Sequence, residues 1–254
     1  MTSMLITGGD GFVTAPVLET LLYPGHPVVT AVRSSRKGQI ILDAHGSHSR
    51  DCSRLCDCAV IHCATLYYFK SQQNKQDLLD PRSRTVGLPQ ETPEDALSAT
   101  RVIVTSSSAA ILDQNKPTRV FSVADWCHVA EQQVLIGLVN SYRASKTFVG
   151  KKRPNLSLVV CNTPLFLGPV VHQLDSLDSL DISTTEFVTS LTVLLKNPDQ
   201  NAGNHLSVDV RDLAIRHRPA AEKLKATGKR SFMIIREGLP SPRNTLPTGE
   251  PFNP

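Results

Sequence analysis

The order of apolar and polar residues near the start of the chain predicts three consecutive elements. Residues 4–7 form a short apolar run, residues 8–12 are rich in glycine, and residues 13–22 have apolar side chains at helical spacing. A second apolar run covers residues 28–32. Short apolar runs next to glycine are typical of buried strands, and a 3.6-residue period is typical of a helix. The pattern predicts strand, glycine turn, helix and strand.

The glycine turn has the composition of a dinucleotide-binding turn. Gly8 permits a tight turn off the strand, and Gly11 lets the backbone approach a pyrophosphate closely. The following helix offers free N–H groups and the positive end of its dipole to that anion. A glycine motif is weak evidence by itself, but here a strand precedes it and a helix follows it, as the motif requires.

The segment after the second predicted strand indicates which nucleotide is preferred. A site selective for NAD usually has a carboxylate here that binds the ribose hydroxyls. This chain has Arg33-Ser34-Ser35-Arg36-Lys37 instead, without an acid. Cations and hydroxyls suit a 2′-phosphate, so the segment favours NADPH over NADH. The alternative is a solvated basic loop, because Arg and Lys are mostly exposed in any protein.

Strand and helix patterns alternate through the rest of the chain. Buried-type strands are predicted at residues 58–64, 101–105, 157–161 and 232–235, and a helix carries residues 142–146. Such alternation is typical of a parallel, doubly wound α/β sheet. No internal repeat is present.

Tyr142 and Lys146 suggest a reaction. Four residues apart on a helix, they share one face, and a nearby ammonium favours the phenolate form of the tyrosine. Such a tyrosine can donate a proton to a carbonyl oxygen as hydride reaches the carbon, and a serine at a strand end can hold that oxygen. The spacing alone also fits two side chains paired on the surface of a helix. It supports a catalytic role only together with the glycine turn and the serines that precede it.

Composition and charge exclude several classes of protein. The chain has 254 residues and a net charge of +4, with no long Lys/Arg block of the kind that marks a nucleic-acid-binding arm. It has no apolar run long enough for a membrane span and no signal-peptide pattern, so we expect a cytoplasmic protein. Cys52, Cys56, Cys58 and Cys63 lack a C-x-x-C pair, so we expect thiols and no metal site.

Together these segments resemble a known family. The chain is similar to extended short-chain dehydrogenases/reductases of the epimerase/dehydratase superfamily, in the branch of fungal aldehyde and ketone reductases and plant dihydroflavonol reductases. The matching segments follow the family's order: residues 5–13, 32–34, 104–110, 125–126, 142–146, 162–164, 168–169 and 208–214, with His217.

The resemblance implies roles for individual residues. Ser107, Tyr142 and Lys146 would form the catalytic triad, with Ser107 chosen as the second serine of Thr-Ser-Ser. The implied cofactor is NADPH (NADP+), and the implied substrate is a small carbonyl compound. The implied cofactor contacts are Thr7, Gly8, Gly11, Phe12, Val13, Arg33, Lys37, Ala64, Tyr142, Lys146 and Thr163. Residues 1–165 would form the NADP-binding domain, and residues 166–254 a reduced substrate lobe interleaved with the last core strands.

The chain also departs from the family. Only 28 residues separate Arg33 from His62, where the family has a crossover helix, a third strand and another helix. Residues 39–43 could be that strand, with Asp43 near the adenine, but a parallel pairing needs a longer crossover. The strand is therefore antiparallel, displaced or absent. Pro89 and Pro93 interrupt the next predicted helix, which begins near residue 78.

These departures lead to structural and functional expectations. We expect the core to survive, the second strand to be an exposed edge, and residues 34–57 and 238–254 to be the least ordered. We also expect weak cofactor affinity, low activity, and a monomer or weak homodimer. The alternative function is a nucleotide-binding scaffold or redox sensor with impaired catalysis.

Overall fold

The structure is a computed structural model, and it describes six segments of the chain. These are residues 2–46, 55–63, 97–112, 120–125, 156–171 and 206–233, together with single helical positions at 184, 185, 188, 189, 192 and 196. The predicted helix at residue 78, Pro89, Pro93 and residues 238–254 lie outside the described residues.

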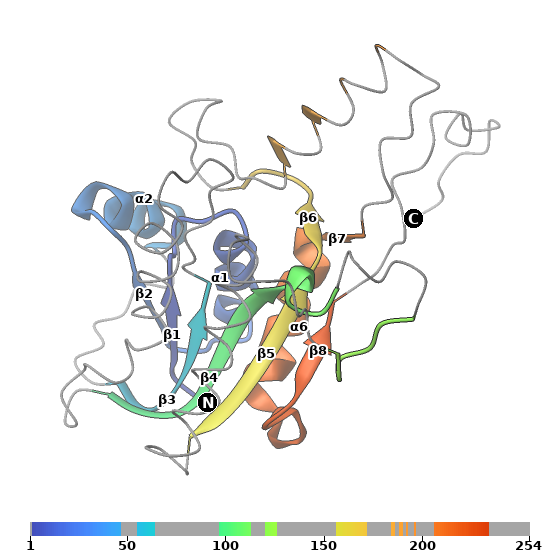
Figure 1. The fold of residues 1–254 in the computed structure, drawn as a ribbon. Helices are drawn as coiled ribbons and strands as arrows, with labels where there is room; N and C mark the ends of the chain where they lie inside the picture. Colours follow the sequence, from blue (N-terminus) through green and yellow to red (C-terminus); the bar gives the residue numbers. More distant parts are fainter. Residues whose placement is uncertain are drawn as a thin grey trace, which may run out of the picture.

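A parallel sheet forms the centre of the described structure (Figure 1). Its order is β2-β1-β3-β4-β5-β8, and every neighbouring pair runs parallel. The predicted Rossmann-like parallel sheet is confirmed. The strands are β1 (Met4–Thr7), β2 (Val28–Ala31), β3 (Leu55–His62), β4 (Leu97–Ser107), β5 (Ser157–Thr163) and β8 (Arg230–Phe232).

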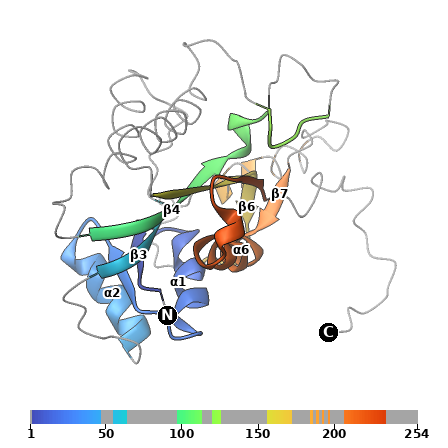
Figure 2. The same cartoon turned by 90° about the horizontal axis from the view of Figure 1, so that it is seen from below.

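Three described helices cover one face of this sheet. Figure 2 shows α1 (Thr14–Leu22), α2 (Ser35–His45) and α6 (Val210–Glu222) on the same side. Val17 and Leu21 lie one turn apart on α1 and are fully buried against Leu213 of α6 and the inward side chains of the sheet. None of the described helices has the length and apolar character that crossing a membrane requires.

A second, two-stranded sheet lies next to the carboxyl ends of the main strands. It pairs β6 (Leu165–Leu167) with β7 (Ser207–Asp209) in parallel. Asp209 begins α6 by accepting a 2.8 Å hydrogen bond from the Arg211 N–H. Gly168 has φ +148°, and a Cβ there would lie 2.8 Å from Val210 Cγ1, so this junction requires glycine. Described residues beyond 165 therefore include parts of the core. The boundary between domains stays a prediction.

Residues 39–43, the candidate for a third strand that the sequence left open as antiparallel, displaced or absent, do not form a strand. This segment lies inside α2, where Gln39 Nε2 donates a 2.8 Å hydrogen bond to Asp43 Oδ1 one turn later. Ser34 begins the helix by accepting from the Lys37 N–H at 3.4 Å. Ile41 packs against the core. Helix capping and this contact outweigh the strand propensity of the two adjacent isoleucines.

The loss of that strand changes the edge of the sheet. After α2, the next described strand is β3, which pairs with β1 on the side opposite β2. Within the described segments, β2 pairs only with β1. The expectation that residues 34–57 would be poorly ordered is wrong for α2. The open adenine side stays a prediction.

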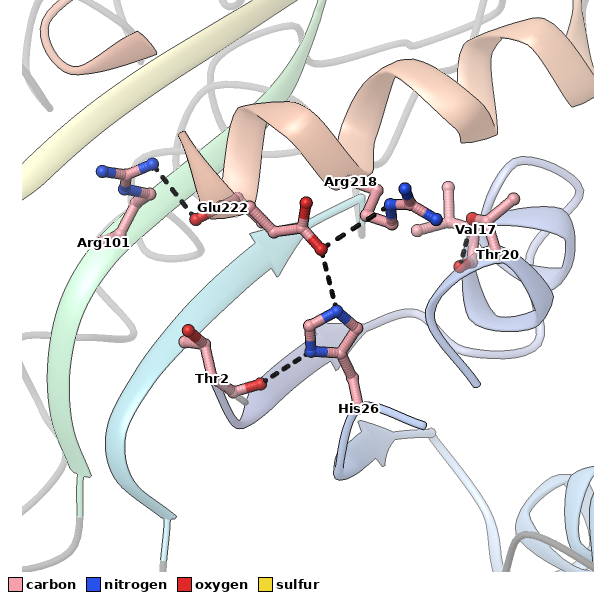
Figure 3. A network of polar contacts seen from close by, with 8 residues as sticks. Thr2, Val17, Thr20, His26, Arg101, Arg218 and Glu222 are labelled. Carbon is pink, nitrogen blue, oxygen red and sulfur yellow. Dashed lines mark hydrogen bonds and ion pairs between the residues drawn. The ribbon is translucent and has the colours of Figure 1, made fainter. Parts of the chain in front are cut away.

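A network of charged groups holds the C-terminal end of α6 at the amino edge of the sheet (Figure 3). The Arg101 guanidinium of β4 is buried, and it donates to the carbonyl oxygens of Ala220, Ala221 and Lys223 at 3.2, 3.1 and 2.7 Å. These carbonyls lie in the last turn of the helix and just beyond it, where intrahelical partners run out. Arg101 therefore supplies the donors that this helix end lacks.

His26 attaches the turn before β2 to the same helix end. Its Nε2 lies 2.9 Å from Glu222 Oε1, and its Nδ1 lies 3.2 Å from the Thr2 carbonyl oxygen (Figure 3). Both oxygens only accept hydrogen bonds, so the doubly protonated ring satisfies both contacts and the neutral ring satisfies one. Arg218 lies 3.6 Å from the same carboxylate.

Candidate functional site

Four strands bring the candidate site residues to one edge of the sheet. Thr7 is in register with His62, His62 with Val104, and Ser107 with Thr163. The carboxyl ends of β1, β3, β4 and β5 therefore lie side by side. This is the edge at which ligands bind in open α/β sheets.

The glycine turn begins directly after β1, as predicted. Gly8 has φ 72°, and the N–H groups of Gly8 and Gly9 both donate to the Ala31 carbonyl of β2, at 3.0 and 3.2 Å. The Gly11 N–H donates to the Gly8 carbonyl at 2.9 Å and closes the turn. A Cβ at Gly11 would lie 3.2 Å from that carbonyl oxygen. The missing side chain leaves the backbone of the turn open to close approach.

Gly9 has a packing role that the sequence analysis did not assign. A Cβ at this position would lie 1.8 Å from Thr30 Oγ1 and 3.3 Å from Ile41 Cδ1. Glycine is thus required here because the turn lies directly on β2 and α2. In the sequence, the two consecutive glycines at positions 8 and 9 were the sign of this close packing.

Phe12 and Val13 follow the turn with buried side chains. The Phe12 ring contacts Phe166 of β6, with ring centroids 5.9 Å apart and planes tilted by 32°. The Thr14 and Ala15 N–H groups donate to the Gly11 carbonyl at 3.1 and 3.0 Å. Contacts from Phe12 and Val13 to a nucleotide would therefore come from the backbone.

The basic segment forms the start of a helix rather than a loop. Ser34 is the N-cap of α2, and Lys37 lies in its first turn, which has no acidic residue. Arg33 lies just before the cap and is exposed. Lys37 Nζ forms an ion pair with Asp10 Oδ2 of the glycine turn. Asp10 had no expected role, because no local pattern in the sequence connects it with a lysine 27 residues away.

The Asp10 carboxylate is stabilised in its charged form. Burial raises its pKa, but the hydrogen bond from Lys37 and the charges of Lys37 and Arg33 bring the pKa below its usual value. Asp10 therefore places a negative charge between the glycine turn and the basic start of α2.

His62 is a neutral group at the end of β3. Its Nδ1 and Thr7 Oγ1 are joined by a 2.8 Å hydrogen bond, and both residues are buried. Burial lowers the pKa of His62 to about 4, because the charged imidazolium would lose its hydration. This hydrogen bond fixes the side chain of Thr7, a predicted cofactor contact.

A partly buried chain of polar groups joins the end of β3 to β4 and α6 beneath the same edge. His217 Nδ1 donates to the Leu213 carbonyl at 2.8 Å, and burial lowers the pKa of His217. In the neutral ring Nε2 then only accepts, so the Thr105 hydroxyl donates to it at 2.9 Å. Thr105 Oγ1 lies 3.2 Å from Cys63 Sγ and accepts from that thiol.

The thiols at this edge are protonated. Burial raises the pKa of Cys63 to about 11, although hydrogen bonds to Thr105 and Thr14 oppose the shift. Burial, followed by the neighbouring Cys63, raises the pKa of Cys161 to about 12. Neither thiol has the character of a nucleophile. Within the described part of the chain, Cys58, Cys63 and Cys161 form no disulfide, and no cluster of metal-ligating side chains is present.

The serine-bearing end of β4 follows directly after Thr105. Ser107 lies two residues after Thr105, so both side chains leave the same face of the strand. Ser106 faces the opposite way and is buried, and its carbonyl accepts a 2.9 Å hydrogen bond from the Thr163 hydroxyl. Ser107 is half-buried and in register with Thr163.

Several predicted site residues lie outside the described segments. They are Ala64, Tyr142 and Lys146. The structure thus brings together Thr7, Gly8, Gly11, Ser107 and Thr163 at one edge, with Arg33 and Lys37 beyond β2.

Comparisons with known proteins agree with this geometry. No family model matches the chain. The chain is 30% identical to ketoreductase azaE of Aspergillus niger, over 91% of this chain and 77% of that protein. It is 26% identical to the NADPH-dependent methylglyoxal reductase Gre2 of Saccharomyces cerevisiae, over 98% of this chain and 86% of that protein.

The fold agrees as well. The solved structure of yeast methylglyoxal/isovaleraldehyde reductase Gre2, complexed with NADPH, matches with a TM-score of 0.79 at 21% identity. The match covers 93% of this chain and 79% of that one. The alignment with the Gre2 sequence extends over 298 positions, more than the 254 residues of this chain, so Gre2 has internal residues that this chain lacks. The chain belongs to the extended short-chain dehydrogenases/reductases, in the branch of the fungal ketone and aldehyde reductases.

Proposed function

We propose that this protein is an NADPH-dependent reductase that converts an aldehyde or ketone to an alcohol by hydride transfer. One observation carries the proposal: the glycine turn and the Ser107 strand end share the carboxyl edge of one parallel sheet, with the basic start of α2 beside the turn. The relatives are reductases by name, which favours turnover over a non-catalytic scaffold.

The described residues fit the nucleotide at two points. The open backbone at Gly11 and the start of α1, which has no acidic residue in its first turn, suit the pyrophosphate. Arg33 and the start of α2 suit a 2′-phosphate. We assign backbone contacts to Gly8, Phe12 and Val13, a side-chain contact to Thr7, and positions beside the nicotinamide to Ala64 and Thr163.

The bound nucleotide supplies the hydride in this proposal. Tyr142 donates a proton to the substrate carbonyl oxygen, and Ser107 holds the same oxygen by a hydrogen bond. Lys146, four residues after Tyr142 in the sequence, stabilises the phenolate and holds the nicotinamide ribose. The partly buried chain from Cys63 through Thr105 to His217 supports the strand end that carries Ser107.

Substitution of Tyr142 tests the chemistry. Tyr142→Phe keeps the ring and removes the acid, so we expect turnover to fall about 10²–10⁴-fold with NADPH binding nearly unchanged. Oxidation of NADPH is followed with a panel of small aldehydes and ketones. Tyr23→Phe is the matched control, because Tyr23 is 91% exposed at the end of α1. An unchanged rate in Tyr142→Phe would remove this residue from the mechanism.

Substitution of Arg33 tests the nucleotide. Arg33→Asp places an acid where an NAD-selective site has one, so the preference should change from NADPH to NADH. Arg216→Asp, the same change at an exposed position on α6, controls for net charge. Equal affinities of the unaltered protein for both nucleotides would contradict the NADPH assignment.

A further inference from the structure

The glycine turn carries an acidic residue that faces the basic start of α2. Asp10 lies between Gly9 and Gly11, and its carboxylate contacts the Lys37 ammonium. The Asp10 side chain is only 17% exposed and that of Lys37 is 35% exposed. The pair is therefore more enclosed than an ordinary surface ion pair, and water screens it less.

The position of this pair matters because both partners belong to the nucleotide site. Lys37 belongs to the basic start of α2, which with Arg33 suits the 2′-phosphate, and Asp10 lies in the turn proposed to hold the pyrophosphate. The charge of Arg33 also acts on the Asp10 carboxylate. A 2′-phosphate arriving beside Arg33 would meet a lysine that is already neutralised and a carboxylate of its own sign.

We propose that Asp10 is a specificity-determining residue that withholds Lys37 from the 2′-phosphate and so weakens the preference for NADPH over NADH. This inference rests on the proposed function. NADPH binding must either separate Lys37 from Asp10 or bring the phosphate close to a carboxylate. NADH lacks the 2′-phosphate, so its binding requires neither change. The Asp10 carboxylate repels the pyrophosphate of both nucleotides, and this repulsion does not alter their ratio.

A purely structural role of the ion pair makes a different prediction. Asp10 also ties the glycine turn to α2, so its loss could loosen both elements. Loosening the turn would weaken NADPH and NADH alike and leave their ratio unchanged. The ratio of the two dissociation constants therefore separates charge competition from anchoring.

The test measures both dissociation constants for a set of variants by nucleotide fluorescence. Asp10→Asn keeps the size of the side chain and releases Lys37. We expect the ratio of the NADH constant to the NADPH constant to rise about tenfold, comparable to one charge-assisted hydrogen bond. Glu19→Gln is the matched control, because it removes one exposed carboxylate from α1 and should leave the ratio unchanged.

Lys37→Met completes a double-mutant cycle. In the unaltered protein, Lys37→Met should weaken the binding of NADPH more than that of NADH, because it leaves the Asp10 carboxylate uncompensated beside the 2′-phosphate. In the Asp10→Asn background it should abolish the gain. A ratio that stays constant or falls in Asp10→Asn overturns this inference alone. An unaltered protein that binds neither nucleotide overturns the proposed function, and the inference with it.

Discussion

The two edges of the sheet treat ionisable groups in opposite ways. At the carboxyl edge, burial holds His62, Cys63, Cys161 and His217 neutral, and hydroxyl groups connect them. At the amino edge, the buried Arg101 and the exposed side of α6 form charged contacts. Beneath the site, buried groups stay uncharged and are linked through hydroxyl groups, whereas at the amino edge charged groups hold a helix end. The contribution of the carboxyl edge to stability should therefore depend on pH, and that of the partly exposed ion pairs at the amino edge on salt.

Removal of Arg101 should have the largest effect. Arg101→Met keeps most of the apolar stem but leaves the carbonyls of Ala220, Ala221 and Lys223 without their donor. We expect the free energy of unfolding to fall by about 3–4 kcal/mol, measured by urea denaturation. A loss below about 1 kcal/mol would show that α6 does not depend on this contact.

Acid should destabilise the carboxyl edge through His62. The pKa of His62 is about 4 in the folded protein and 6.5 in the reference state, so the unfolded chain binds more protons between these values. The free energy of unfolding therefore keeps its full value, as far as His62 is concerned, above about pH 6.5. It falls by about 2–3 kcal/mol as the pH is lowered toward 4. Urea curves at pH 7 and 4.5 should differ less for His62→Gln than for the unaltered protein. If the two proteins lose the same stability between pH 7 and pH 4.5, His62 is not the group responsible.

Breaking the chain of polar groups at His217, its buried end, should reduce the free energy of unfolding by less. His217→Phe fills the space but leaves the Thr105 hydroxyl without its acceptor, so we expect a loss of about 1–3 kcal/mol. Adding Thr105→Val removes the stranded hydroxyl and should recover part of this loss in thermal or urea unfolding. Strictly additive losses would show that the two side chains are not coupled.

The smallest effect is expected at His26. Glu222→Gln removes the charge that faces both His26 and Arg218, and the carboxylate is partly exposed, so the loss should be about 0.5–1 kcal/mol. The loss should shrink in high salt, because salt screens the partly exposed contacts of Glu222 with His26 and Arg218. A loss of the same size in low and high salt would refute this account of the pair.

The elements predicted correctly have local causes. The apolar runs at residues 4–7 and 28–32 form β1 and β2, and the periodic run at residues 13–22 forms α1. The spacing of the apolar residues shows which face of each element is buried, so these elements can be predicted from the sequence. The run at residues 39–43 became helix because the Ser34 cap and the core contact of Ile41 outweighed local strand propensity. Capping was readable in the sequence, but the core contact was not.

The candidate site divides in the same way. Gly8, Gly11 and Ser107 could be identified from the sequence, because a turn and a strand end have local signatures. The family could also be identified, because its motifs recur in order along the chain. The pairing of Asp10 with Lys37 and the chain from Cys63 to His217 could not, because each joins residues far apart in the sequence. Only the packing of helices on the sheet brought those charges and hydroxyls together and decided which of them are neutral.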